Sequence, residues 1–162
     1  MVPTLAFIGH QDSGKTTLLT QLIPILLGRG YRVGTVKHTP HEAELDQSGK
    51  DSFRHRRAGA VQTLVVSSSE YVLFGGPRPE ETIQGTIDRL FVGLDLVLAE
   101  GFKHGPFPKI EVYRSLSHPL LAGQIEVLAV VTDQKLSLPA GIPLLSPGRP
   151  ERIVWFIEES FL

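Results

Sequence analysis

Short apolar runs alternate with longer amphipathic stretches along this chain. Runs of strand length occupy residues 4–8, 94–99 and 127–131, and nearly all of their positions are apolar. Residues 15–27 instead place leucine and isoleucine at helical spacing. Strands that are apolar on both faces and alternate with helices are typical of parallel sheets covered by helices. The pattern therefore predicts an α/β domain with a mainly parallel central sheet and helices on both faces.

The remaining segments continue the same alternation. We predict further strands at 31–36, 62–67, 71–74, 109–113 and 142–145, and helices at 51–58, 80–91 and 151–161. The helix at 15–27 ends at a glycine-rich signal, Gly28-Arg29-Gly30, and Pro24 predicts a kink or an earlier end. A length of 162 residues fits one domain, 1–162.

Composition narrows the class of partner. Lys and Arg total 16 against 17 Asp and Glu, a net charge of -1, so we expect neither nucleic acid nor a membrane as partner. Cysteine is absent, which excludes disulfide frameworks and thiolate metal sites. The segment Met1-Val2-Pro3-Thr4 leads into the first apolar run without a basic region, and no apolar stretch approaches the length of a membrane span. We therefore expect a soluble cytoplasmic protein.

The strongest chemical signal lies between the first strand and the first helix. Its pattern is Gly9-x-x-x-x-Gly14-Lys15-Thr16, the spacing of a phosphate-binding loop, and it predicts a P-loop NTPase-type three-layer domain. Backbone N–H groups of the loop residues His10, Gln11, Asp12 and Ser13 would face phosphate oxygens at the helix N-terminus. Lys15 would reach the β- and γ-phosphates, and the Thr16 hydroxyl would bind Mg²⁺. The alternative is a chance glycine turn before a helix.

Two acidic residues that end or follow predicted strands are candidates to bind the metal ion or to position water beside it. Glu100 ends a buried strand, and Gly101 would let the next N–H approach the γ-phosphate; an ordinary strand-end carboxylate is the alternative. Asp46 lies in the loop after the second strand, where it would place Mg²⁺ or water. In the same loop His38 and His41 would suit Zn²⁺ or Ni²⁺, unless the loop is simply solvated.

Two local basic clusters and one more acid complete the candidates. The first cluster holds Lys50, Arg54, Arg56 and Arg57, and the second holds Lys103 and Lys109. Both would bind a second anionic ligand or a partner. A solvated helix face is the alternative for the first cluster. Asp133 follows an apolar strand, where a carboxylate can accept hydrogen bonds from the N1–H and amine of guanine. Turn capping explains Asp133 equally well.

Taken together, these residues resemble the molybdopterin-guanine dinucleotide biosynthesis protein B family. The resemblance covers about residues 4 to 133. It rests on residues 9–17, Lys37-His38, Asp46, Gly49-Lys50-Asp51-Ser52, Arg54-His55-Arg56 with Ala58-Gly59-Ala60, Glu100-Gly101-Phe102-Lys103, and Pro108-Lys109-Ile110-Glu111-Val112. The phosphate-binding loop alone indicates an NTPase. The Gly-Lys-Asp-Ser and Glu-Gly-Phe-Lys blocks make the match specific.

The resemblance implies a GTP-binding, weakly GTP-hydrolysing homodimer. Such a protein assists the guanylyltransferase that makes molybdenum guanine dinucleotide cofactor from molybdopterin and GTP, with molybdopterin itself a candidate ligand. Phosphates and Mg²⁺ would be bound by Gly9, Gly14, Lys15, Thr16 and Thr17. Asp46 and Glu100 would act around the metal and the attacking water, Asp133 would recognise guanine, and the basic cluster at Arg54, Arg56 and Arg57 would face the pterin phosphate or the partner enzyme.

Related dimeric NTPases often carry a second lysine after the first loop glycine, where this chain has His10. Slow intrinsic hydrolysis is therefore expected. Three rival functions stay open at this point. They are a GTP-dependent metallochaperone using His38 and His41, a small-molecule kinase with Arg54 to Arg57 as its acceptor lid, and a binding module without turnover.

Overall fold

The computed structural model describes residues 1–39, 46–114 and 118–162, which form two compact units. The first unit comprises residues 1–38 and 91–162, and the second comprises residues 39–90. In chain order the elements are β1 Thr4–Ile8, α1 Lys15–Gly28, β2 Val33–Lys37, α2 Asp51–Arg57, β3 Gln62–Val66, β4 Tyr71–Gly75, α3 Ile83–Leu90, β5 Leu96–Glu100, β6 Lys109–Val112, β7 Ala129–Val131, β8 Leu144–Leu145 and α4 Pro150–Phe161. That these units make up one domain stays a prediction.

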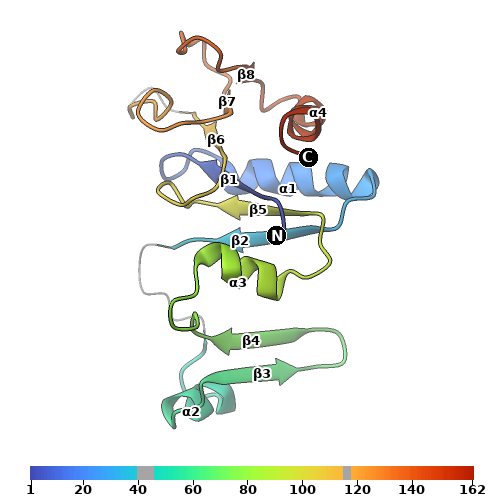
Figure 1. Cartoon of the computed structure of the whole chain (residues 1–162), viewed down its shortest axis with the longest axis vertical. Helices are drawn as coiled ribbons and strands as arrows, with labels where there is room; N and C mark the ends of the chain where they lie inside the picture. The colour runs from blue at the N-terminus through green and yellow to red at the C-terminus, as the bar shows by residue number, and fades with distance from the viewer. Residues whose placement is uncertain (40–45, 115–117) are drawn as a thin grey trace. The chain divides into compact units, whose positions relative to one another are not determined.

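A six-stranded sheet forms the centre of the first unit (Figure 1). Its strand order is β2-β5-β1-β6-β7-β8, and every neighbouring pair is parallel. The predicted mainly parallel sheet is thus confirmed. Because β1 lies between β5 and β6, the loop that leaves β1 opens at the carboxyl edge in the middle of the sheet. In parallel sheets, that edge is where ligands bind.

Helices α1 and α4 share one apolar core with the sheet. Leu18, Leu22 and Leu26 of α1 are at most 3% exposed and follow each other at a spacing of four residues. This burial explains one correction to the sequence prediction. The helix does not end at Pro24 but continues to Gly28, because the buried leucines on both sides hold it in the core despite the missing N–H.

An ion pair fixes the amino-terminal ends of β2 and β5. Arg32 binds Asp95 through three hydrogen bonds, from its backbone N–H and from Nε and Nη2, at 2.7 to 3.0 Å. Hydrogen bonds from the Arg32 side chain, and then from its backbone, lower the pKa of Asp95 to about 2. The pair therefore stays intact well below neutral pH and keeps the two strands aligned at the edge opposite the candidate site.

The second unit contains α2, α3 and an antiparallel hairpin of β3 and β4. The predicted serine turn joins the strands: Ser67 Oγ accepts the Glu70 N–H at 3.0 Å, and the Ser67 N–H donates to the Glu70 carbonyl at 2.8 Å. Helix α2 packs on β3. Within the described parts of the chain, no helix is long and apolar enough to cross a membrane.

Candidate functional site

The loop between β1 and α1 is shaped by two glycines. We call residues 9 to 16 the glycine loop. Gly9 has φ of 150°, and a Cβ there would lie 2.3 Å from the Val112 carbonyl oxygen of β6. Gly14 has φ of 89°, a left-handed conformation that side chains rarely adopt. Both positions therefore require glycine, and the close approach to β6 winds the loop over the carboxyl edge of the sheet.

Helix α1 begins at this loop without a cap from any side chain. Its N-cap is Gly14, and its first turn holds no acidic residue. The first N–H groups of a helix lack partners inside the helix, and they carry partial positive charge. An uncapped N-terminus at the carboxyl edge of a parallel sheet suits an anion such as phosphate.

The Lys15 side chain folds over the glycine loop. Its Nζ donates to the carbonyls of Gly9 (3.1 Å) and His10 (2.7 Å) and to Ser13 Oγ (3.3 Å). Burial lowers the pKa of Lys15 below its ordinary value, and nearby Lys37 adds to this effect, whereas Glu100 and Asp12 oppose it. The ammonium is therefore held within the loop, at the cavity where a phosphate chain would lie.

Thr16 and Glu100 come together as the sequence predicts. The Thr16 hydroxyl donates to Glu100 Oε2 at 2.8 Å, and Lys37 Nζ lies 3.3 Å from Glu100 Oε1. The pairing of β2 with β5 sets Lys37 directly beside Glu100. These residues line a cavity of about 400 Å³ together with Asp12, Lys15 and Arg114. A hydroxyl and a carboxylate are oxygen donors of the kind that Mg²⁺ prefers.

Asp133 lines a second cavity, of about 250 Å³, on the side of the glycine loop toward β7. Gly14, Thr17 and Arg114 line both cavities. The exposed carboxylate follows β7 by two residues and accepts a hydrogen bond from the Gln134 side chain at 2.9 Å. The structure thus places Asp133 beside the glycine loop, as base recognition requires, while its part in recognition stays a prediction.

His10 makes contacts that the sequence did not predict. Its Nε2 donates to the Pro119 carbonyl at 3.0 Å, and its ring stacks on His118 with centroids 4.6 Å apart. The ring is therefore directed to the loop after β6.

Gly101 has φ of 93°, and its N–H donates to the Phe7 carbonyl. The prediction that Gly101 lets the next backbone N–H approach the γ-phosphate stays a prediction.

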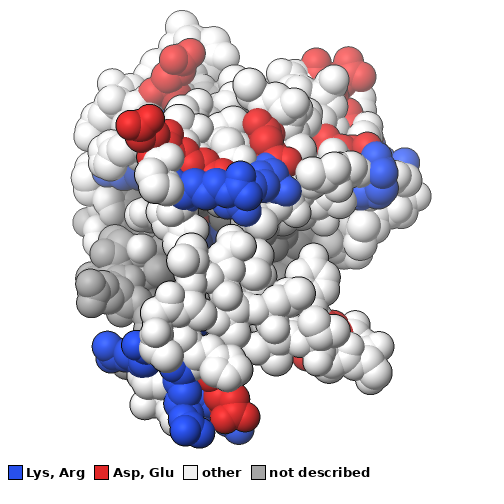
Figure 2. Space-filling model, turned by 60° about the horizontal axis from the view of Figure 1, so that its bottom comes forward, with Lys and Arg blue, Asp and Glu red and all other residues white. Residues whose placement is uncertain are grey.

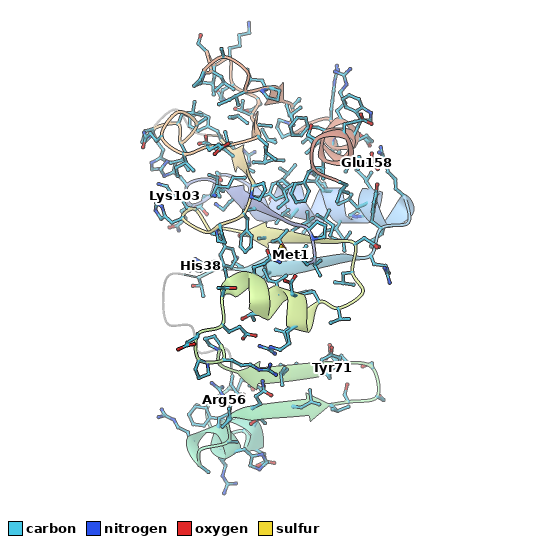
Figure 3. All side chains as sticks on the ribbon, in the orientation of Figure 1. Met1, His38, Arg56, Tyr71, Lys103 and Glu158 are labelled. Atoms are coloured by element: carbon cyan, nitrogen blue, oxygen red, sulfur yellow. The ribbon has the colours of Figure 1, made fainter. Side chains whose placement is uncertain are left out.

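Asp46 and the first basic cluster belong to the second unit. The Asp46 carboxylate accepts from Ser52 Oγ at 3.0 Å and from Arg56 Nη1 at 3.2 Å. Arg56, labelled in Figure 3, also lies over the Phe74 ring, at 5.3 Å from its centroid. Asp46 therefore fastens α2 to the segment before it, and its predicted place at the metal stays a prediction.

The other predicted basic residues differ in how far their charges are available. Arg54 is an exposed partner of Asp51 at 3.7 Å, and Arg57 lies over the Phe53 ring. Lys50 and Lys103 are exposed. On the face drawn in Figure 2, Lys and Arg form separate patches with Asp and Glu beside them, which fits the balanced composition. A second anionic ligand at these residues stays a prediction.

Lys109 and Glu111 show what the Pro-Lys-Ile-Glu block does in the fold. Lys109 Nζ donates to the carbonyls of Gly105 (2.9 Å) and Phe107 (2.7 Å), so it closes the loop before β6. Glu111 is completely buried, and its carboxylate accepts the N–H groups of Leu121 (2.8 Å) and Ala122 (2.7 Å). Glu111 is absent from the predicted site, although a glutamate inside an apolar strand indicates a buried carboxylate with hydrogen-bond partners.

The sequence patterns also did not single out two residues that line the larger cavity. Lys37 and Arg114 line the cavity of about 400 Å³ without being among the predicted site residues. Each follows or ends a strand of the sheet, Lys37 on β2 and Arg114 two residues after β6. Only the strand order, with β6 on one side of β1 and β5 followed by β2 on the other, shows that both strand ends lie near the glycine loop.

The predicted histidine pair is described only in part. The His38 ring packs against Phe102, with centroids 5.0 Å apart, and His41 lies outside the described residues. Among the side chains that the structure describes, no three His, Asp or Glu residues gather as metal ligands would. The metallochaperone alternative stays a prediction.

Comparison with known proteins places the chain in a family. The family model described as "Molybdopterin guanine dinucleotide synthesis protein B" matches residues 4–133. The molybdopterin-guanine dinucleotide biosynthesis adapter protein of Escherichia coli K12 is 40% identical, over 98% of this chain and 93% of its own length. The adapter protein of the same name from Haemophilus influenzae is 38% identical, over 97% and 88%.

Solved structures agree with this placement. A crystal structure of molybdopterin-guanine biosynthesis protein B superposes with a TM-score of 0.75 at 30% identity, covering 96% of this chain and 97% of that one. The crystal structure of Bacillus subtilis MobB gives 0.76 at 26% identity, covering 99% and 98%. They confirm the predicted α/β fold of P-loop NTPase type. The chain therefore belongs to the molybdopterin guanine dinucleotide synthesis protein B family.

Proposed function

We propose that the chain binds GTP with Mg²⁺ at the glycine loop. One observation carries this proposal: the uncapped N-terminus of α1, the Lys15 ammonium and the Thr16–Glu100 pair all border one cavity, and Asp133 lines the adjoining one. The phosphates would lie along the loop, and the guanine base would reach Asp133. A carboxylate can accept both guanine N1–H and its exocyclic amine, a pairing that adenine does not offer.

Thr16 and Glu100 would hold the metal. Bound Mg²⁺ would supply charge neutralisation at the phosphate oxygens. Lys15 spans the carbonyls of Gly9 and His10, and phosphate oxygens would replace these partners on binding. We propose weak GTPase activity, because position 10 carries a histidine whose ring is bound to Pro119 and His118 in place of a second lysine.

The cellular role that we propose is that of a cytoplasmic adapter. The E. coli and H. influenzae relatives are both described as molybdopterin-guanine dinucleotide biosynthesis adapter proteins. By that relationship, this chain would assist the guanylyltransferase that joins GTP to molybdopterin. The exposed guanidinium groups of Arg54 and Arg57 on α2 offer contacts for the pterin phosphate or for the partner enzyme.

Calorimetric titration with GTP and then with ATP, each with Mg²⁺, tests the nucleotide proposal. We expect GTP to bind at least ~10-fold more tightly, because only guanine satisfies the Asp133 carboxylate. Asp133→Asn should remove most of this preference, since the amide presents a donor where guanine also donates. Glu126→Gln, an exposed carboxylate change, should leave it intact. Equal affinity for the two nucleotides would exclude Asp133 as the base-recognising residue.

We also propose that the chain forms a homodimer through the β3–β4 hairpin. Opposite residues of an antiparallel pair share a face, and one face of this hairpin carries Leu64, Val66, Tyr71 and Leu73, which are 39 to 70% exposed. Tyr71, labelled in Figure 3, begins β4. Helix α2 packs on β3, yet these four apolar side chains stay exposed, and a second copy of the hairpin would cover them.

Sedimentation tests the dimer. The unsubstituted chain should sediment as a dimer, and Val66→Glu should shift it to the monomer, because a charge cannot be buried there without a partner. Ser68→Glu, which adds the same charge at the exposed turn, should leave the dimer intact. A Val66→Glu protein that still sediments as a dimer would place the interface elsewhere.

A further inference from the structure

Arg114 lies where the two cavities of the first unit meet. It lines the cavity of about 400 Å³ that holds Thr16 and Glu100, and it lines the cavity of about 250 Å³ that holds Asp133. Its Nη1 lies 3.7 Å from the position that a Cβ on Gly14 would occupy. The guanidinium therefore reaches the end of the glycine loop, at the start of α1.

The backbone that carries Arg114 is firmly held. Strand β6 pairs with β1, so the chain leaves β6 directly beside Gly9. Tyr113, 7% exposed, donates its N–H to the Val131 carbonyl at 2.9 Å and its hydroxyl to the His118 carbonyl at 3.0 Å. The position of Arg114 thus follows from the sheet and from a buried tyrosine.

The charge of Arg114 is unpaired among the residues that the structure describes. The two other cations of the larger cavity are engaged: Lys15 by the carbonyls of the glycine loop, and Lys37 by Glu100 at 3.3 Å. Arg114 makes no ion pair or hydrogen bond within residues 1–39, 46–114 and 118–162. A guanidinium has donors in a fork that fits two oxygens of a phosphate.

Resting on the proposed GTP site, we propose that Arg114 binds the α- and β-phosphates of the nucleotide. The order of the cavities supports this position. The γ-phosphate and metal belong with Thr16 and Glu100 at one end, and the base belongs with Asp133 at the other. Gly14, Thr17 and Arg114 line both cavities, so they border the middle of the bound molecule.

Titration of Arg114→Ala with GDP and with GTP, each with Mg²⁺, tests the assignment. We expect both affinities to fall by the same factor, on the order of 10 to 100-fold, because the α- and β-phosphates are common to both ligands. Arg114→Lys should lie between, since it keeps the charge and loses the fork. Arg152→Ala, an exposed arginine change on α4 that lines neither cavity, should leave both affinities unchanged.

Two results would overturn the assignment while the GTP site itself stands. Unchanged affinities in Arg114→Ala would exclude a phosphate contact. A loss confined to GTP would place the guanidinium at the γ-phosphate. If the unsubstituted protein binds neither nucleotide, the proposed function fails, and the Arg114 assignment fails with it.

Discussion

Replacing Lys15 with alanine should weaken binding of GTP with Mg²⁺ by ~100-fold or more. The Lys15 ammonium lies over the glycine loop, bonded to two carbonyls that phosphate oxygens would replace. Removing one member of a partly buried charge pair costs about 2 to 5 kcal/mol, and about 1.4 kcal/mol is tenfold in affinity. Isothermal titration of the variant and the unsubstituted protein measures the difference directly.

The control for Lys15→Ala is Arg152→Ala. Arg152 also belongs to the first unit, but it is exposed and lines neither cavity. It should leave the GTP affinity unchanged, which separates a specific contact from a general loss of positive charge. Melting curves of both variants should match that of the unsubstituted protein. A Lys15→Ala protein that binds GTP as tightly as its parent would refute the phosphate role of the glycine loop.

The sequence predicts the fold of the first unit because its strands follow simple rules. Apolar runs buried on both faces, such as residues 96–99, have few alternatives to a parallel sheet. The glycine loop is equally local, since its strand, its spacing and its helix are contiguous in the chain. Pro24 shows the limit of local rules: its effect on α1 depends on leucines that only the tertiary structure buries.

The rest of the candidate site depends on strand order, which one sequence does not reveal. Lys37 and Arg114 reach the same cavity from β2 and from the end of β6, strands far apart in the chain. The histidine stack of His10 and His118 likewise joins two distant loops. The Lys109 ammonium is bound to two backbone carbonyls, and its predicted contact with a second ligand or a partner stays a prediction. Its charge was visible in the sequence, but its partners were not.

Replacing Glu111 with glutamine should lower the free energy of unfolding by about 2 to 4 kcal/mol, and replacing it with alanine should lower it by about 3 to 5 kcal/mol. Both oxygens of this fully buried carboxylate accept backbone N–H groups, those of Leu121 and Ala122. Alanine leaves both N–H groups buried without a partner. Glutamine keeps one acceptor and turns an N–H₂ donor toward the other N–H. Urea unfolding followed by circular dichroism measures both changes.

The effect of Glu111 should extend to the loop after β6 that contacts His10 of the glycine loop. Glu111 holds residues 121 and 122, and the same loop carries Pro119 and His118, which bind the ring of His10. In Glu111→Gln, amide exchange should therefore quicken more at residues 118 and 120–122 than at β1. Glu159→Gln, an exposed change on α4, should alter neither stability nor exchange. If Glu111→Ala lowers the free energy of unfolding by less than about 1 kcal/mol, water or a rearranged loop satisfies both N–H groups. The structural role assigned to Glu111 would then be wrong.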